Sequence, residues 1–176
     1  MNITLVRHGE TNYTVKGLCS EKAGVNVHLT VKGELQAKLL AKRLKDENFD
    51  IIYTSELYRT LQTAEFINEY HNVTHKVDER INDRKTGFDS RPIREFYTFV
   101  SKDPIHTRPP GGETLLDVRE RVKSFLDDLK TQPHERILIV THSLVVKLMY
   151  VIVNKRPLED LFAMNVPPAG RVNLSL

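Results

Sequence analysis

Three short segments of the chain are almost continuously apolar, and they constrain the fold more than any other feature. They are 2–7, 49–54 and 136–141, with the sequences NITLVR, FDIIYT and RILIVT. A strand that is covered on both faces, as in a parallel sheet between helices, shows this pattern, whereas a strand with one wet face alternates. We therefore expect three central strands. Two further strands are expected at 73–78 and 172–176, the second at a sheet edge.

Amphipathic segments alternate with these strands. Four of them are expected to be helices: 31–47, 56–70, 113–130 and 143–153. In the first helix, four leucines would form the buried face: Leu35, Leu39, Leu40 and Leu44. Thr30 and Ser55 are the expected caps of the first two helices. Alternating strands and helices predict an α/β fold, a three-layer sandwich whose mostly parallel central sheet has helices on both faces.

The composition limits the possible functions. A chain of 176 residues fits one domain, and its net charge of +3 is too small to indicate nucleic acid or an anionic membrane. That charge still permits a local cluster of basic side chains around an anionic small molecule. The single cysteine, Cys19, cannot form an intrachain disulfide. No apolar run approaches the ~20 residues of a membrane span, and no signal sequence is evident, so we expect a cytoplasmic protein.

The segment 79–112 interrupts the alternation of strands and helices. It contains seven glycines and prolines and four aromatic residues. A connection this long inside a compact domain is usually functional or disordered, and the aromatic residues favour order. We expect a short helix near 92–101 and interpret the whole segment as a lid or specificity segment.

Basic and imidazole side chains follow the three apolar strands. Arg7 and His8 end the first strand, Arg59 lies one turn into the helix after the second, and His142 ends the third. Ligands bind outside the carboxyl ends of strands in open α/β sheets, so these side chains are expected to converge. Guanidinium groups match the oxygens of a phosphoryl group, and a neutral imidazole is a competent nucleophile that nearby guanidinium groups keep unprotonated. The set indicates phosphoryl transfer through a phosphohistidine, with no metal or other cofactor required.

Five ordered segments of the chain resemble the histidine phosphatase superfamily, the phosphoglycerate mutase-like family. The family signature is RHGET at 7–11. The other four segments are HLTVKGELQA at 28–37, SELYRTLQTAE at 55–65, PPGGETLLDVRERV at 109–122 and ILIVTHSLVVKLM at 137–149. The resemblance implies a phosphoglycerate mutase-like fold and one histidine phosphatase domain over 1–176, with 79–112 inserted.

The resemblance also implies roles for single residues. His8 is expected to become phosphorylated, and three side chains are expected to bind the phosphoryl oxygens: Arg7, Arg59 and His142. Two further phosphate contacts depart from the family pattern. Thr14 stands where many relatives have an asparagine, and Ser143 stands where relatives often have a glycine.

The general acid is less firmly indicated by the resemblance. Relatives usually have a glutamate four residues before a glycine, and INDRKTG at 81–87 fits that spacing with Asp83. Asp83 is therefore expected to protonate the leaving oxygen and later to activate water. Because its side chain is shorter than the family's, Glu79 remains the second candidate and Glu113, also a possible substrate contact, the third.

Substrate specificity is expected in 79–112 and in the loop 12–27. Five basic residues could contact the rest of the substrate, although solvated surface charge is the commoner role for any one of them: Arg84, Lys85, Arg91, Arg94 and Arg108. His71 and His75 imitate a pair of zinc ligands, but they lie where a helix becomes a strand and no third ligand is indicated, so we expect no metal.

The sequence leaves the function partly open. The expected activity is hydrolysis of a small-molecule phosphomonoester. A phosphoglycerate mutase-type phosphotransferase is an alternative, although the mutases of this family are typically longer. A phosphoprotein-directed enzyme or a regulatory binding module is another alternative. The oligomeric state is open, and the strand at 172–176 could pair across a dimer.

Overall fold

The computed structural model describes residues 1–24 and 26–176. Five strands form one sheet in the order β3-β2-β4-β1-β5. The parallel strands are β1 (Asn2–Arg7), β2 (Ile51–Thr54), β3 (Thr74–Val77) and β4 (Arg136–Thr141). The fifth strand, β5 (Arg171–Ser175), pairs antiparallel with β1 at one edge. The predicted central strands are therefore β1, β2 and β4, and the predicted edge strand is β5.

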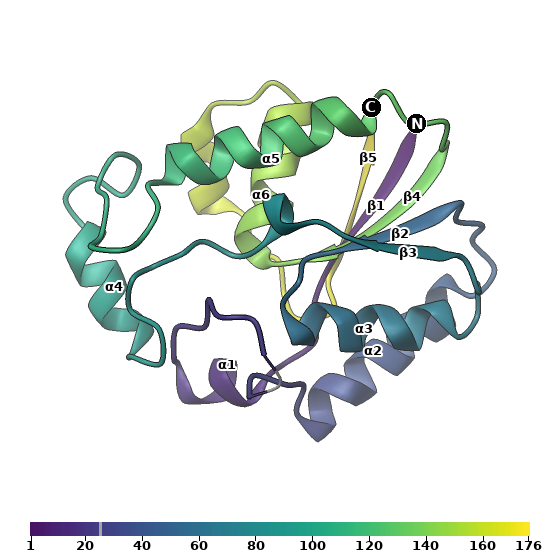
Figure 1. Ribbon diagram of the computed structural model, residues 1–176, viewed down its shortest axis with the longest axis horizontal. Helices are drawn as coiled ribbons and strands as arrows, with labels where there is room; N and C mark the ends of the chain where they lie inside the picture. Colours follow the sequence, from purple (N-terminus) through teal and green to yellow (C-terminus); the bar gives the residue numbers. More distant parts are fainter. Residues whose placement is uncertain (25) are drawn as a thin grey trace.

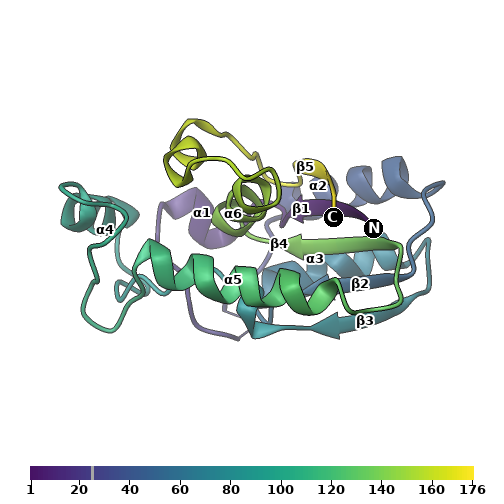
Figure 2. The same cartoon turned by 90° about the horizontal axis from the view of Figure 1, so that it is seen from above.

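Helices cover both faces of the sheet (Figures 1 and 2). On one face lie α2 (Val31–Leu44) and α3 (Tyr58–Asn68), and on the other lie α5 (Leu115–Leu129) and α6 (Ser143–Val153). Along β4, Ile137 and Ile139 point into the core under α5 and α6, while Leu138 and Val140 point into the core under α2 and α3. The strands are apolar on both sides because both sides are buried, and the predicted three-layer fold class is confirmed.

The buried face of α2 differs from the predicted one. Leu35 and Leu39 are exposed. The buried face of the helix carries small residues beside Leu40 and Leu44: Gly33, Ala37 and Ala41. The cause is close backbone contact, because a Cβ atom on Gly33 would lie 2.0 Å from the carbonyl oxygen of Glu10. Thr30 caps this helix as predicted and accepts a hydrogen bond from the N–H of Gly33.

Four shorter elements complete the fold. They are α1 (Asn12–Lys16), α4 (Ile93–Val100) and two 3₁₀ helices, η1 (Glu79–Ile81) and η2 (Leu158–Ala163). The helix predicted near 92–101 is α4. The sequence does not predict the other three because each is too short to show an apolar period.

The segment 79–112 lies beyond the carboxyl ends of the parallel strands, together with α1 (Figures 1 and 2). Its apolar side chains form a small core with Cys19: Phe88, Phe96, Val100 and Ile93. The backbone of Cys19 also donates to the carbonyl of Arg91 and accepts from the N–H of Ser90, both at 2.9 Å. The segment is therefore ordered, as predicted, and is joined to the loop after α1.

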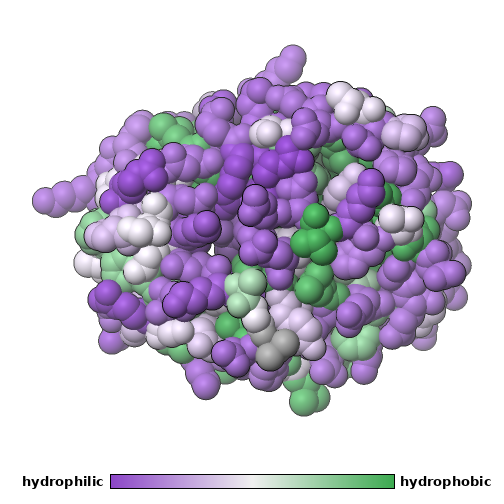
Figure 3. Space-filling view, viewed as in Figure 1, coloured by the Kyte–Doolittle hydropathy of each residue, from purple (hydrophilic) through white to green (hydrophobic). Residues whose placement is uncertain are grey.

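The face of the molecule seen in Figure 3 is mostly hydrophilic, with apolar side chains in small separate groups. Within residues 1–24 and 26–176, no helix combines the length and the apolar character needed to cross a bilayer. Pairing of β5 across a dimer stays a prediction.

Candidate active site

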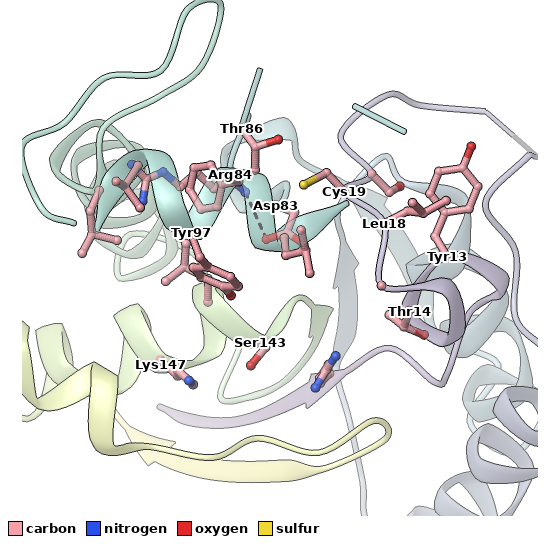
Figure 4. Close-up of a pocket in the computed structure, with 18 of the residues that line it drawn as sticks. Tyr13, Thr14, Leu18, Cys19, Asp83, Arg84, Thr86, Tyr97, Ser143 and Lys147 are labelled. Atoms are coloured by element: carbon pink, nitrogen blue, oxygen red, sulfur yellow. Dashed lines mark hydrogen bonds between the residues drawn. The ribbon is translucent and has the colours of Figure 1, made fainter. Parts of the chain in front are cut away.

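A cavity of about 590 Å³ opens at the carboxyl ends of the parallel strands. Its walls come from the carboxyl end of β1, the amino-terminal part of α6, α1 and the loop after it, α3, η2 and the segment 79–112 (Figure 4). Seven predicted site residues line it: Arg7, His8, Thr14, Arg59, Asp83, Arg84 and Ser143. His142 adjoins it, with its ring centroid 5.2 Å from that of His8.

The register of two neighbouring strands places the histidines together. Arg7 and Thr141 are partners at the ends of β1 and β4, and the N–H of His8 donates to the carbonyl of Thr141 at 3.0 Å. His8 and His142 are therefore the next residues of the two adjacent strands. Since neighbouring strands lie about 4.8 Å apart, the short distance between the rings follows from the sheet itself.

His8 is held as a neutral imidazole whose Nε2 lone pair faces Arg59. Its Nδ1–H donates to the carbonyl of Gly9 at 2.7 Å, and its Nε2 accepts a hydrogen bond from Nε of Arg59 at 3.2 Å. Burial and then the positive charges of Arg59 and Arg7 hold the pKa of His8 well below its ordinary value. A lowered pKa favours the neutral imidazole, in which the nitrogen that faces Arg59 carries a lone pair.

Two guanidinium groups flank this imidazole. Arg59 is almost fully buried and also donates to the hydroxyl and carbonyl oxygens of Ser20, at 3.0 and 3.1 Å. Arg7 donates from Nη1 to the carbonyl of Val166 at 2.7 Å. Such a pair of planar donors beside a lone-pair nitrogen is suited to the oxygens of a phosphoryl group.

Two buried polar atoms beside the cavity lack a hydrogen-bond partner among the described residues. They are Nε of Arg7 and Nδ1 of His142. A buried polar atom without a partner costs about 1–3 kcal/mol. An oxygen-rich ligand in the cavity would supply both partners.

His142 is oriented by Ser55. The Nε2 of His142 lies 2.9 Å from Oγ of Ser55, which is 2.8 Å from Oγ1 of Thr60 and also accepts from the N–H of Leu57. The prediction that Ser55 occupies the cap position of α3 is wrong, since Leu57 does and the Ser55 side chain bonds to the histidine. Burial and then the charge of Arg59 keep the pKa of His142 well below its ordinary value.

Asp83 follows η1 in a loop and reaches the cavity from above in Figure 4. Its Oδ2 lies 3.5 Å from Nη2 of Arg59 and 3.6 Å from Nδ1 of His142. Glu79, the second candidate for the general acid, is exposed and lies outside the cavity wall that the described residues form. The carboxyl group next to the histidines is that of Asp83.

Glu113 does not face the cavity, contrary to its prediction as a substrate contact. Its carboxylate accepts from Arg121 at 2.8 Å and from the N–H of Lys85 at 2.8 Å. Burial opposes its ionisation, but these donors hold the pKa of Glu113 below its ordinary value. Arg121 in turn donates to three carbonyl groups of the loop that ends at Asp83: those of Arg80, Asn82 and Asp83. The pair therefore supports the loop that carries the acid.

Thr14 and Ser143 both line the cavity, Thr14 from α1 and Ser143 from the start of α6 (Figure 4). The hydroxyl of Thr14 donates to the carbonyl of Thr11 at 2.9 Å and accepts from the N–H of Thr11 at 2.8 Å. Its proton is thus directed into the capping box of α1 and not into the cavity. Ser143 is the first residue of α6, where backbone N–H groups favour an anion.

The other predicted contacts are mostly structural. Arg84 donates to the carbonyls of Glu113 at 2.9 Å and Thr107 at 3.3 Å, and its guanidinium lies 4.9 Å from the ring centre of Phe96. It therefore ties the segment 79–112 together. Four more basic residues lie outside the cavity wall that the described residues form: Lys85, Arg91, Arg94 and Arg108. Two of them pair with nearby acids, Arg91 with Glu95 and Arg108 with Asp117.

The rings of His71 and His75, the two histidines spaced like zinc ligands, contact different residues. His75 lies with Nε2 2.8 Å from Oγ1 of Thr54, whereas the His71 ring packs against Phe49 with centroids 4.9 Å apart. Across the described residues, no group of three or more His, Cys, Asp and Glu side chains is placed to hold a metal ion.

Several residues in or beside the cavity wall carry no sequence pattern of their own. Arg121 lies within the segment 109–122 that resembles the family, but its partners cannot be inferred from that segment. Lys147 on α6 and Tyr97 on α4 line the cavity as isolated residues in amphipathic helices. In the loop 12–27, where specificity is expected, Leu18, Cys19 and Ser20 line the cavity, and residue 25 lies outside the described residues.

Comparison with known proteins places this geometry in a family. Phosphoserine phosphatase 1 of Hydrogenobacter thermophilus is 31% identical over 160 residues, which cover 85% of this chain and 74% of that protein. The fructose-2,6-bisphosphatase TIGAR of Xenopus tropicalis is 35% identical over 136 residues, which cover 72% of this chain. The matched region spans about half of the latter protein, 49% of its length.

Solved structures agree with the fold. The alpha-ribazole phosphatase of Shigella flexneri superposes with a TM-score of 0.91 at 28% identity, covering 100% of this chain and 91% of that one. The phosphoserine phosphatase of Entamoeba histolytica shares the fold, with a TM-score of 0.81 at 23% identity and coverage of 98% and 89%. These relatives bear the names of phosphatases, in agreement with the predicted enzyme class, a phosphoric monoester hydrolase. The family model of the histidine phosphatase superfamily (branch 1) matches residues 3–176, and the chain belongs to that superfamily.

Proposed function

We propose that this protein hydrolyses a small-molecule phosphomonoester through a phosphohistidine formed on His8. The main supporting observation is the neutral, buried His8, whose Nε2 accepts a hydrogen bond from Arg59 in a cavity that Arg7 also lines. A neutral imidazole is a competent covalent nucleophile. Relatives named for phosphoserine and for fructose 2,6-bisphosphate, both small phosphorylated compounds, support the substrate class.

In the first half-reaction, Nε2 of His8 attacks phosphorus in line with the leaving oxygen. The P–N bond forms as the P–O bond breaks, and Asp83 donates a proton to the leaving alkoxide. As Nε2 attacks, the Nε–H of Arg59 stops donating to His8 and donates to a phosphoryl oxygen instead. The Nε–H of Arg7 donates to a second phosphoryl oxygen. The hydroxyl of Ser55 donates to Nε2 of His142, which leaves a proton on Nδ1 for the phosphoryl group.

In the second half-reaction, water replaces the leaving alcohol. The Asp83 carboxylate accepts a proton from this water, which attacks phosphorus and releases inorganic phosphate from His8. Each of these steps uses a side chain of this protein as donor, acceptor or nucleophile. We accordingly propose that hydrolysis needs no metal.

The segment 79–112 has a separate role within this proposal. We propose that it is an insertion within a single histidine phosphatase domain, and that it confines the leaving group. Three of its residues support this, since they line the cavity beyond the strand ends: Arg84, Phe96 and Tyr97. Because the loop that carries Asp83 belongs to the same segment, the acid and the wall of the leaving-group site would be positioned together.

The test measures inorganic phosphate released from a panel of phosphomonoesters in EDTA by wild type and by His8→Ala. Release by the wild type alone is expected, with no turnover in the variant. Rapid quenching should trap a phosphoenzyme that is stable to base and labile to acid. Absence of release from every compound would contradict the proposal and direct attention to phosphoglycerate isomerisation.

A further inference from the structure

The cavity wall contains a cation that the proposed mechanism does not use. Four of the described lining residues are cationic: Arg7, Arg59, Arg84 and Lys147. The first two flank the nucleophile, and Arg84 donates to backbone carbonyls. For the ammonium of Lys147, the described residues provide neither a hydrogen bond nor an ion pair, and the nearby charge of Arg7 repels it.

This lysine is in an unfavourable environment when the cavity holds no anion. It is half-buried, and burial followed by the Arg7 charge lowers the pKa of its ammonium group. The wall formed by α6 and η2 is otherwise rich in apolar side chains: Leu144, Leu161 and Phe162. A charged group placed among apolar side chains and beside a like charge is destabilised unless an anion accompanies it.

Lys147 lies beyond the place that the proposal gives to the transferred phosphoryl group. In the proposal, the transferred phosphoryl group is bound at His8, near Ser143 at the start of α6. Lys147 follows Ser143 by four residues and shares its helix face, one turn away from the strand end. In Figure 4, Ser143 lies below Asp83 near the middle of the cavity, and Lys147 lies further along α6, on the side away from Thr14.

The cavity has room for more than a phosphoryl group. Its volume of about 590 Å³ falls in the range of sites that enclose whole small molecules. We propose that the substrate carries a second anionic group, a carboxylate or a second phosphate, and that Lys147 binds it. This inference rests on the proposed function, which it sharpens by naming a substrate class and a residue that selects it.

The test compares kcat/KM for two matched pairs of substrates. The first pair is 3-phosphoglycerate and glycerol 3-phosphate, which differ in a carboxylate. The second pair is propane-1,3-diol bisphosphate and its monophosphate, which differ in a phosphate. The enzymes are wild type, Lys147→Met, which keeps the length of the stem, Lys147→Arg, which keeps the charge, and Lys42→Met as a control at an exposed position.

The wild type should prefer the more highly charged member of at least one pair. Lys147→Met should reduce that preference by about ten- to a hundredfold, the worth of one hydrogen bond between charged groups. Lys147→Arg should retain most of it, and Lys42→Met should behave as wild type. The pair that shows the effect identifies the second group as a carboxylate, a phosphate or either.

Other outcomes would overturn the inference. An equal loss on both members of each pair would mean that Lys147 acts on the transferred phosphoryl group. An unchanged preference in Lys147→Met, or its loss in Lys147→Arg as well, would show that the lysine charge does not select the substrate. If wild type shows no charge preference but hydrolyses p-nitrophenyl phosphate in a His8-dependent way, the inference fails alone. If it hydrolyses nothing, both fail.

Discussion

The two sides of the cavity are built in different ways. On the sheet side, His8, Arg59 and His142 are 3%, 3% and 0% exposed, and backbone pairing of adjacent strands places the histidines. On the other side, Asp83 has a side chain that is 35% exposed and lies in a loop. The proposed phosphoryl chemistry therefore relies on side chains buried at the end of the central sheet, whereas the proposed leaving-group side relies on a partly exposed loop.

Among the described residues, side-chain contacts and single backbone hydrogen bonds hold that loop in place of strand pairing. Arg121 donates to its carbonyl groups, and Arg84 donates to the carbonyl of Thr107 in the same segment. The carboxylate of Glu21 accepts from the N–H groups of Thr86 and Gly87. Such ties are individually modest, so the loop is the part of the site where single substitutions can change geometry without unfolding the protein.

The largest effect that separates the two sides is expected for Asp83→Asn. Loss of a general acid should lower kcat by about 10²–10⁴ for alkyl phosphates and much less for p-nitrophenyl phosphate, whose leaving group needs little protonation. Single-turnover rates across a series of leaving groups measure this. Glu79→Gln is the control, and a stronger leaving-group dependence in that variant would make our assignment wrong.

A smaller effect, with a pH signature, is expected for Arg59→Met. Loss of a phosphoryl donor should lower kcat/KM by about 10²–10³. Because the Arg59 charge lowers the pKa of His8, its removal should raise that pKa. Only neutral His8 attacks, so the acid limb of the pH profile should move to higher pH.

The profile is measured with p-nitrophenyl phosphate, for which the acid is least needed. Arg59→Lys keeps the charge and should keep the acid limb near its wild-type position, although the rate falls. Arg43→Met, at an exposed position of α2, serves as the control. An acid limb that moves to lower pH in Arg59→Met would contradict the electrostatic explanation.

A still smaller effect on turnover is expected for Arg121→Met. The change removes three hydrogen bonds to the loop and leaves Glu113 without its ion-pair partner. Because the pair is only partly shielded from water, we expect a stability loss of about 2 kcal/mol and a roughly tenfold lower kcat on alkyl phosphates. Urea unfolding and the leaving-group series measure these changes.

The matched control is Arg119→Met, which removes an exposed pair with Glu120 and should change stability by less than about 0.5 kcal/mol. If Arg121→Met lowers the rate equally for alkyl and p-nitrophenyl phosphates, the arginine does not act through the position of Asp83. That result would separate general support of the fold from support of the acid.

The smallest effect is expected for Arg80→Met. This arginine pairs with Asp78 and Asp128, partly in water, near the start of the same loop. Such pairs contribute under about 1 kcal/mol, so the unfolding free energy should fall by no more than that and kcat should stay within about twofold. A loss of stability or kcat as large as that of Arg121→Met would show that the exposed ion pairs of Arg80 support the loop as much as the hydrogen bonds of Arg121 do.

The sequence predicts the sheet side of the cavity well, but it predicts the loop side only in part. Continuous apolar segments identify β1, β2 and β4, and the residues that follow such strands converge by topology. That reasoning brings Arg7, His8, Arg59 and His142 to one edge of the sheet, where the structure has them. Their catalytic roles remain predictions for the experiments above.

The remaining features depend on contacts between distant residues that leave no period in the sequence. The buried face of α2 is set by its approach to the backbone at Glu10, and not by where the leucines lie. Glu113 follows two glycines in a motif, yet its partner Arg121 turns it away from the cavity. Lys147 is notable because the described residues give its ammonium no ion-pair partner. That property depends on the three-dimensional surroundings and cannot be inferred from the sequence.

The pairing of β1 also has a consequence for how the protein folds. The strand that precedes His8 has its two neighbours at β4 and β5, in the last quarter of the chain. Closing so long a loop is slow compared with forming local contacts. Helices α2 and α3 can therefore form early, but the two histidines meet only after most of the polypeptide has collapsed. Recovery of enzymatic activity during refolding would thus report the completion of the central sheet.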